Sequence, residues 1–326
     1  MKKWNNYING SWISYSSKKI PIINPYTEKK IAEATASDKK DVNAAVEAAK
    51  KAFEDWKETT PAERSALFIK LADLIEKDKK RLAEIESQQQ GKTLALANAD
   101  LDFSIDNLRF FAGACRVFQT TAAGNYADTR RDKKHKAIGT SILKREPLGV
   151  VAAITPWNYP IMMACWKLAS VAAGNTIILK PSALTPLTTL ELAMHTEKAG
   201  FPKGVINVLT GNGENVGIML AEHPDIDIIA LTGSSETGKK IMEIASKTMK
   251  KVHLELGGKA PFIVFADAEL QRAASYAIES SIVNSGQDCT AAARIYVQDI
   301  IYEKFISMVR DEAKKMSGKE VEWKSS

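Results

Sequence analysis

The spacing of apolar residues along the chain changes near Gly149. Before that point, and after short β-like pieces in residues 1–40, apolar side chains recur every three or four positions, which is typical of amphipathic helices. A capping box at Thr60, with Glu63 as its partner and proline in the first turn, marks the start of one helix. The spacing predicts helices over 42–56, 61–90 and 94–118.

Beyond Gly149, short continuous apolar runs alternate with helical segments. Strands of this kind are covered on both faces, so the pattern predicts a parallel sheet between two layers of helices. The strands are expected at GVVAAIT, NTIILKPS, GVINVLTG, DIIALTGS, KKVHLELGG, PFIVFAD and RIYVQ. Such sheets bind ligands outside the carboxyl ends of their strands. Functional residues are therefore expected at 155–158, 180–182, 211–213, 233–238 and 255–258.

Length and composition favour a soluble globular protein. The 326 residues, 45% hydrophobic and 26% charged, fit about two domains. No run approaches the ~18 apolar residues of a membrane span, and the basic N-terminus lacks the apolar core of a secretory signal. We therefore expect a cytoplasmic protein without a membrane partner.

The net charge of +6 does not by itself define a partner. One dense basic run, RRDKKHK, covers Arg130–Lys136 and precedes the strand-like SILKREPLG. A nucleic-acid patch is one interpretation, but a solvated hairpin or loop is favoured. We expect a two-stranded excursion here and no nucleic-acid partner.

Cys115, Cys165 and Cys289 are the only cysteines. They lie far apart without CxxC spacing, so neither a disulfide framework nor a metal site is expected. Cys289 follows Gly286 and precedes small residues, in GQDCTAAAR. A reactive cysteine must be accessible and able to form a thiolate. A buried inert cysteine is the alternative, but the polar neighbours of Cys289 fit it poorly.

Two further side chains could take part in chemistry. Glu255, in LELGGK, ends an apolar strand, and partial desolvation by its leucine neighbours would favour its protonated form and suit a general base. An exposed carboxylate is the alternative. Asn158, in TPWNYP, could donate a hydrogen bond to a developing oxyanion or cap the following helix.

Two glycine-rich turns follow predicted strands. GNGENVG, at Gly211–Gly217, resembles a dinucleotide fingerprint, but its last spacing is too long and no acid ends a following strand at the usual distance. TGSSETG, at Thr232–Gly238, would suit a phosphate at a helix N-terminus. A plain tight turn remains the alternative for both.

The motifs TPWNYP, KPS, TGSSETG, LELGGK and GQDC occur in this order, each at a strand end or turn. Together they resemble the NAD(P)-dependent aldehyde dehydrogenase superfamily over nearly the whole chain. PWNYPIMMACWKLA and GQDCTAAARIY are most similar to its aminoaldehyde branch, of the γ-aminobutyraldehyde dehydrogenase type. The resemblance implies an α/β fold with a Rossmann-type dinucleotide-binding domain (1–123 and 148–255), a β-hairpin oligomerisation arm (124–147) and the N-terminal part of an α/β catalytic domain (256–326).

The resemblance also implies a reaction. Cys289 would attack an aldehyde, and the Asn158 side chain with the Cys289 backbone amide would hold the oxyanion. Hydride would leave for the cofactor, NAD or alternatively NADP, and Glu255 would activate water to hydrolyse the thioester. An ω-aminoaldehyde such as 4-aminobutanal is the favoured substrate.

Further residues acquire roles from the same resemblance. Lys180 would contact the adenosine ribose, and Gly233 and Ser234 the pyrophosphate. The implied cofactor-binding residues are Thr155, Trp157, Lys180, Ser182, Gly233, Ser234, Gly238 and Leu256. The implied substrate-binding residues are Tyr159, Met163 and Trp166, with Asp288 able to attract a cationic amino group.

The sequence departs from the family in two respects. Ala183 stands where the family often has a glutamate that holds the ribose hydroxyls. The chain ends at Ser326, before the family's Glu-x-Phe-Gly-Pro segment and its C-terminal oligomerisation strand. The homo-oligomer that the family implies would lack that strand. One alternative is therefore a truncated, weakly active or inactive homologue that at most binds dinucleotide, and another is ester or thioester hydrolysis by Cys289 without a cofactor.

Overall fold

The computed structural model describes residues 2–118, 121–126 and 139–316. They fall into two compact units: the described residues up to Thr232 together with Glu236–Leu254, and Gly233–Ser235 together with the described residues from Glu255 onward. None of the described helices is both long enough and apolar enough to cross a membrane.

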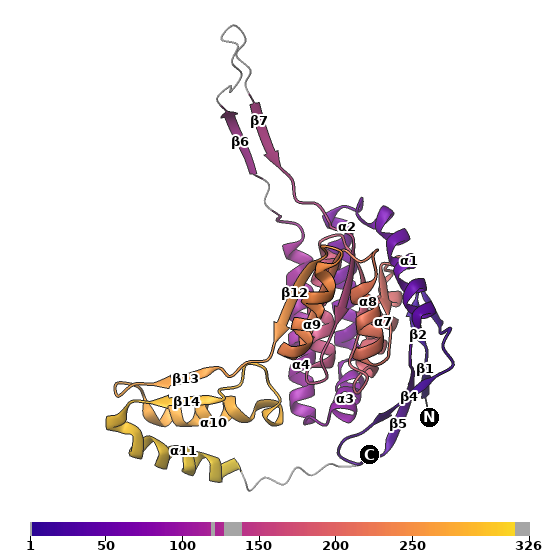
Figure 1. Ribbon diagram of the computed structural model, residues 1–326. Coiled ribbons are helices and arrows are strands. Elements are labelled where there is room, and N and C mark those ends of the chain that lie inside the picture. The colour runs from indigo at the N-terminus through magenta and orange to yellow at the C-terminus, as the bar shows by residue number, and fades with distance from the viewer. Residues whose placement is uncertain (1, 119–120, 127–138, 317–326) are drawn as a thin grey trace. The chain divides into compact units, whose positions relative to one another are not determined.

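A seven-stranded sheet organises the first unit (Figure 1), and its strand order is β12-β11-β8-β9-β10-β2-β3. Its central neighbours β11, β8, β9 and β10 are parallel, as the sequence pattern predicts, and β8, β9 and β10 are buried at every position. The N-terminal hairpin β2–β3 extends the sheet in the antiparallel sense. The bounds are β2 (Asn6–Ile8), β3 (Ser11–Ile13), β8 (Val150–Ile154), β9 (Thr176–Lys180), β10 (Ile206–Val208), β11 (Ile228–Gly233) and β12 (Lys251–Leu256).

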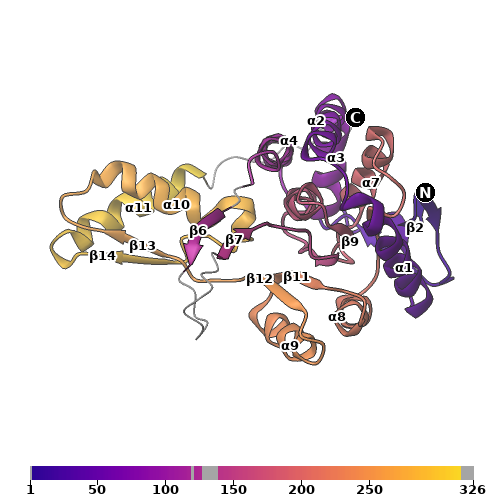
Figure 2. The ribbon, with the colours of Figure 1, turned by 90° about the horizontal axis from the view of Figure 1, so that it is seen from above.

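Helices cover both faces of this sheet. Figure 2 shows α7 on one side of the strands and α8 and α9 on the other. The capping box predicted at Thr60 is confirmed, with Pro61 in the first turn. The helices of this unit are α1 (Lys39–Trp56), α2 (Pro61–Lys77), α3 (Lys79–Gln90), α4 (Leu94–Ala114), α5 (Pro160–Lys167), α6 (Ala169–Ala172), α7 (Leu187–Ala199), α8 (Ile218–Glu222) and α9 (Ser235–Ser246), and a π-helical turn (Gly213–Gly217) precedes α8.

Two predicted helices differ from the observed ones. The helix predicted over 61–90 is divided at Asp78, whose carboxylate accepts a hydrogen bond from Arg81 Nε at 2.9 Å and lies 3.0 Å from His195 Nε2. Aspartate side chains compete with the helical backbone for hydrogen bonds, and apolar spacing does not reveal this. The helix predicted to reach Phe118 ends at Ala114, because Phe118 is exposed and another turn would bury little apolar surface.

The N-terminal helices are fixed to the sheet layer by aromatic packing. The rings of Trp56 and Phe68 lie 6.1 Å and 5.5 Å from that of Phe201, and Trp56 Nε1 donates to the Val171 carbonyl at 3.1 Å. A small sheet in the order β1-β5-β4 lies in the same unit, with β1 (Lys2–Trp4), β4 (Lys19–Ile23) and β5 (Lys30–Thr35).

A β-hairpin forms the predicted two-stranded excursion. Strands β6 (Thr121–Tyr126) and β7 (Gly139–Leu143) pair in the antiparallel sense. The basic run Arg130–Lys136 lies outside the described residues.

The second unit is small. Strands β13 (Pro261–Val264) and β14 (Arg294–Val297) form a parallel pair. Helices α10 (Leu270–Gly286) and α11 (Tyr302–Met316) pack with them around a core of Val264, Ala274, Ala277 and Phe305, and a 3₁₀ turn (Asp299–Ile301) precedes α11.

Candidate active site

Two hydroxyl groups lie at the carboxyl edge of the large sheet. Ile154 pairs with Leu231 in the register of β8 and β11, so Thr155 and Thr232 follow on neighbouring strands. The Oγ1 atoms of both threonines are buried, and neither has a hydrogen-bond partner in the described part of the chain. Buried polar atoms are almost always hydrogen-bonded in native proteins. These two donors are therefore suited to a ligand that binds at this edge.

Lys180 ends the adjacent strand β9. Only 2% of the residue is exposed, and its Nζ donates to the Pro181 carbonyl at 3.1 Å. Burial lowers the pKa of this ammonium group to about 8. A Cβ placed on Gly213 would lie 4.0 Å from Nζ, so the glycine-rich turn borders the ammonium group. The edge therefore presents one buried amine and two hydroxyls that lack a partner among the described residues.

The other residues predicted to bind the cofactor also follow strands. Trp157 is 43% exposed, and Ser182 is half-buried and accepts from the Leu184 amide at 3.3 Å. Gly233 ends β11, Ser234 is exposed in the turn that follows, and Gly238 is buried in the first turns of α9. Leu256, half-buried, ends β12.

Asn158 does not cap the helix that follows it. Tyr159 occupies the N-cap position of α5, with φ −134° and ψ 66° and no side-chain cap. The capping alternative for Asn158 is therefore wrong, because α5 begins one residue too late for it. The Asn158 carbonyl accepts a hydrogen bond from Lys92 Nζ at 2.9 Å.

The predicted substrate residues of α5 differ in exposure. Tyr159 and Met163 are 8% and 7% exposed, and the Met163 amide donates to the Tyr159 carbonyl at 3.0 Å. Trp166 is 44% exposed, and its ring packs in an edge-to-face arrangement with that of Phe103, with 6.1 Å between the centroids. Trp166 thus offers most of the aromatic surface in this set.

A strained turn carries the cysteine. Helix α10 breaks at Val283, and Asn284, Ser285 and Gly286 follow with φ of 52°, 60° and 74°. Consecutive non-glycine residues with positive φ are uncommon and indicate strain at a functional position. The buried Asn284 fixes the turn, since its Nδ2 donates to the Gln287 carbonyl at 3.2 Å and its own carbonyl accepts from the Gln287 amide at 3.1 Å.

Asn284 and Thr232 are not among the site residues that the sequence predicts. The signal for Asn284 was Asn-Ser-Gly directly before the cysteine segment, since these residue types favour left-handed turns. The signal for Thr232 was its place directly before Gly233 at a strand end.

Cys289 differs from the other two cysteines in being exposed. Burial raises the pKa of Cys165 to about 12 and raises that of Cys115, which makes both poor nucleophiles. The buried alternative for Cys289 is therefore wrong. Partial desolvation, then the neighbouring Asp288 carboxylate and the charge of Glu255, raise the pKa of the Cys289 thiol.

Glu255 belongs to the surroundings of Cys289. Its charge acts on the Cys289 thiol, and a Cβ on Gly258 would lie 3.5 Å from the Cys289 carbonyl oxygen. The expected partial desolvation of Glu255 is wrong, because the residue is exposed at the end of β12.

Asp288 is tied into the same loop. One of its carboxylate oxygens accepts from both the amide and the hydroxyl of Thr290, each at 2.7 Å. The carboxylate therefore stabilises the turn after Cys289 and places negative charge next to the sulfur.

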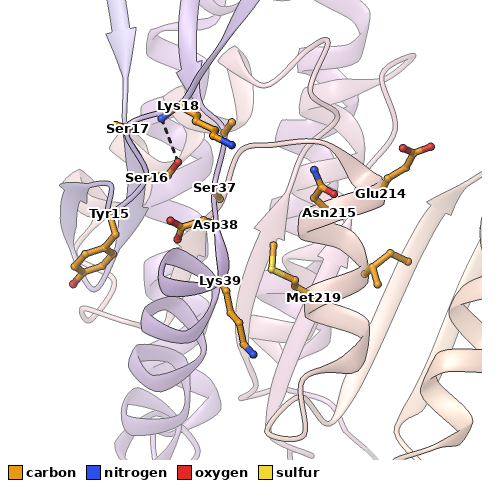
Figure 3. Close-up of a pocket in the computed structure, with 12 residues that line it drawn as sticks. Tyr15, Ser16, Ser17, Lys18, Ser37, Asp38, Lys39, Glu214, Asn215 and Met219 are labelled. Atoms are coloured by element: carbon orange, nitrogen blue, oxygen red, sulfur yellow. Dashed lines mark hydrogen bonds between the residues drawn. The ribbon is translucent and has the colours of Figure 1, made fainter.

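A separate cavity of about 600 Å³ lies between the N-terminal strands and α8 (Figure 3). None of the predicted site residues lines it, and the charges of Lys18 and Lys39 are matched by Asp38 and Glu214. Asp38 also caps α1 by accepting from Lys40 and Asp41 amides. The candidate functional residues are therefore those at the strand ends of the first unit and those of the cysteine turn in the second unit, and this cavity contains none of them.

The first unit has a parallel α/β sheet of the class that binds ligands at the carboxyl ends of its strands, and the second unit carries an exposed cysteine on a turn with positive φ angles. The sequence profile of the Aldehyde dehydrogenase family matches residues 12–324. The chain belongs to the aldehyde dehydrogenase family. Its predicted fold class is confirmed.

Individual relatives agree with this assignment. Betaine aldehyde dehydrogenase of Bacillus subtilis (strain 168) is 41% identical over 314 residues, which cover 95% of this chain and 62% of the relative. A crystal structure of NAD-dependent aldehyde dehydrogenase from Sinorhizobium meliloti has a TM-score of 0.90 at 37% identity, covering 96% of this chain and 62% of that one. Betaine aldehyde dehydrogenase from Staphylococcus aureus in complex with NAD⁺ has a TM-score of 0.86 at 37% identity, covering 96% and 61%. The chain thus spans about three fifths of the length of these relatives.

Proposed function

We propose that this chain carries the NAD-dependent oxidation of an aldehyde to a carboxylic acid, with Cys289 as the nucleophile. The observation that carries the proposal is the exposed cysteine on a turn fixed by Asn284, with the charge of Glu255 acting on its thiol. Family membership supports the reaction type.

The chain's own residues account for each step except the hydride transfer. The Cys289 thiol first loses its proton to solvent. Attack of the thiolate on the aldehyde carbon then forms a carbon–sulfur bond, opens the carbonyl double bond and places negative charge on the former carbonyl oxygen. The Asn158 side chain and the Cys289 backbone amide donate hydrogen bonds to that oxygen. NAD, if held by Lys180, Gly233 and Ser234 at the sheet edge, would supply the hydride acceptor for this carbon, and the carbon would then remain on Cys289 as a thioester. Water that loses its proton to Glu255 attacks the thioester, and the acid and the free thiol are released.

The sheet edge fits a dinucleotide. Thr155 and Thr232 offer buried hydroxyls with no partner in the described residues, and Lys180 offers a buried amine bonded to one backbone carbonyl. Ribose hydroxyls and phosphate oxygens are the groups that would satisfy these donors. Gly233, Ser234 and the start of α9 would hold the pyrophosphate, because helix N-termini attract phosphate.

Ala183 favours tolerance of NADP beside NAD. The half-buried alanine brings no carboxylate to repel a 2′-phosphate, and Lys180 on the preceding strand end supplies positive charge. Ala183→Glu should lower kcat/KM for NADP relative to NAD. An unchanged ratio in steady-state assays would contradict this assignment.

An ω-aminoaldehyde is the proposed substrate class. Asp288 supplies negative charge beside Cys289, and the exposed ring of Trp166 offers a cation–π contact worth about 0.5–2 kcal/mol. Lys92 already lies over the Tyr159 ring at 4.5 Å, so the preference rests mainly on Trp166 and Asp288. Equal kcat/KM for 4-aminobutanal and pentanal would exclude this preference.

The β6–β7 hairpin is proposed as an oligomerisation arm. Ile142 and Leu143 of β7 are 73% and 56% exposed, and neighbouring exposed apolar side chains mark interaction surfaces. Light scattering of the protein and of Ile142→Lys would test it, with a smaller assembly expected for the variant.

The decisive test of the proposed function is aldehyde-dependent NADH formation by the purified chain. Cys289→Ser should abolish it, whereas the matched controls Cys115→Ser and Cys165→Ser should retain it. Full activity in Cys289→Ser would refute the nucleophile. NAD binding without any oxidation by the unmodified chain would favour the alternative of a dinucleotide-binding homologue.

A further inference from the structure

A buried ion pair lies directly beneath the Asn158–Tyr159 turn. Lys92 and Asp100 are paired, with side chains 0% and 5% exposed. The Lys92 ammonium also donates to the Asn158 carbonyl at 2.9 Å and lies 4.5 Å from the centre of the Tyr159 ring. One cation therefore contacts two consecutive residues to which the proposed function assigns roles.

A second buried carboxylate holds the next residues of the same segment. Glu86 accepts a hydrogen bond from the Ile161 amide at 3.2 Å, in the first turn of α5. Its other partners are the Thr188 hydroxyl at 2.6 Å and Gln89 Nε2 at 2.8 Å. Gln89 in turn accepts from the Leu187 amide at 2.7 Å, so α3 is tied to the starts of both α5 and α7.

The local sequence explains why α5 needs such support. The first amides of a helix lack intrahelical partners, and a side chain at the N-cap usually satisfies one of them. Tyr159 occupies that position in α5 and makes no capping bond. Glu86, far away in the chain, takes over this function from α3.

Stability alone is a poor reason to keep this ion pair. Burying two charges costs desolvation that their attraction often fails to offset, and apolar pairs of similar volume frequently do as well. Burial raises the pKa of Glu86 and of Asp100, which reflects the same cost. The pair instead holds one ammonium group in a defined position, where it donates to the Asn158 carbonyl and contacts the Tyr159 ring.

We propose that Lys92, held by Asp100, is a positioning residue that fixes the Asn158–Tyr159 backbone and thereby aims the Asn158 amide for oxyanion binding. Glu86 fixes the other end of the same turn through Ile161. The oxyanion-binding role of the Asn158 side chain rests on the proposed function. The rigidity of the turn does not depend on that function.

The test uses the full chain and replaces both charges together. Lys92→Met/Asp100→Leu removes one positive and one negative charge together, and the Glu86 carboxylate keeps its hydrogen bonds from Ile161, Thr188 and Gln89, so the fold should persist. Lys50→Met/Asp225→Leu is the matched control, because it removes a 2.6 Å ion pair that is exposed and remote in sequence from the turn. Lys92→Gln/Asp100→Asn keeps a hydrogen-bond donor beneath Asn158 and serves as the conservative rescue.

Two measurements, hydrogen exchange and steady-state kinetics, separate the positioning of the Asn158–Tyr159 turn from the oxidation reaction. Hydrogen exchange of the amides in 158–163 should become about tenfold faster in the apolar pair, close to wild type in the control, and intermediate in the amide pair. In the oxidation assay, kcat of the apolar pair should fall about 10–100-fold, since small misplacement of a catalytic group is costly, while KM for NAD stays within about twofold.

The outcomes distinguish this proposal from the proposed function. Wild-type exchange in 158–163 and unchanged kcat in the apolar pair would overturn the positioning role. A wild-type chain that oxidises no aldehyde would refute the proposed function, and the exchange measurement would still decide the rigidity of the turn. If the apolar pair fails to fold, the amide pair decides: wild-type exchange and kcat there would overturn the proposal.

Discussion

The sheet edge and the cysteine turn solve the same problem, the placement of reactive groups, in opposite ways. Thr155 and Lys180 are buried at the ends of parallel strands whose positions are fixed by the core. Cys289 is exposed, and it lies in a short loop in which Asn284 donates to the Gln287 carbonyl and Asp288 accepts from the Thr290 amide. The edge depends on long-range packing, whereas the turn depends on a few local bonds and on strained backbone. Substitutions at the sheet edge should therefore change the affinity for NAD, and substitutions at the cysteine turn should change kcat.

The largest effect is expected at the turn. Asn284→Ala removes the bond to the Gln287 carbonyl and places a less tolerant residue at φ 52°. We expect kcat to fall about 100-fold, because displacement of the nucleophile by about 1 Å costs that much, while NAD affinity stays unchanged.

Asn284→Gly separates the two causes, since glycine accepts positive φ but makes no side-chain bond. It should lie between wild type and Asn284→Ala in kcat. Equal NADH production by all three proteins would show that the turn does not place Cys289.

An intermediate effect is expected at the edge. Thr155→Val and Thr232→Val remove hydroxyls that have no partner in the described residues. Each should weaken NAD binding about fivefold, which corresponds to a hydrogen bond of about 1 kcal/mol. Calorimetry would measure the affinity.

The same variants should not destabilise the protein without ligand. Removing an unsatisfied buried hydroxyl is neutral or stabilising, by up to about 1 kcal/mol. Thermal unfolding of the free chain should therefore give an unchanged or higher midpoint. Loss of stability together with unchanged NAD affinity would assign both hydroxyls to the fold instead of the ligand.

The smallest effect concerns pH. Partial desolvation, Asp288 and Glu255 raise the pKa of Cys289, so the thiol predominates below that pKa and reactivity rises as pH increases through it. Asp288→Asn removes one negative charge and should move the profile to lower pH. Alkylation by iodoacetamide at about pH 7.5 should be about two to five times faster in the variant, and a slower rate would contradict the sign.

The edge could be predicted from the sequence because its pattern is regular. Continuous apolar runs such as Thr176–Lys180 identify buried parallel strands, and ligands of such sheets gather beyond the strand ends. The unbonded state of Thr155 and Thr232 could not be predicted, because it depends on every atom around each hydroxyl.

The turn was only partly predictable. The cysteine stood out by its polar neighbours, and Gly286 indicated a sharp approach. The break in α10 and the role of Asn284 depend on φ angles that local residue types favour without fixing. The Lys92–Asp100 pair joins the loop between α3 and α4, helix α4 and the turn before α5 through packing that apolar spacing does not encode.

The central claim is that Cys289 carries a covalent acyl intermediate, and mass spectrometry of that intermediate tests it most directly. Glu255→Gln should slow hydrolysis of the thioester, so the variant mixed with NAD and 4-aminobutanal and quenched in acid should accumulate it. The account predicts an acyl adduct on the peptide that contains Cys289, formed only when NAD is present. An adduct confined to the peptides of Cys115 or Cys165, or no adduct while NADH is produced, would contradict it.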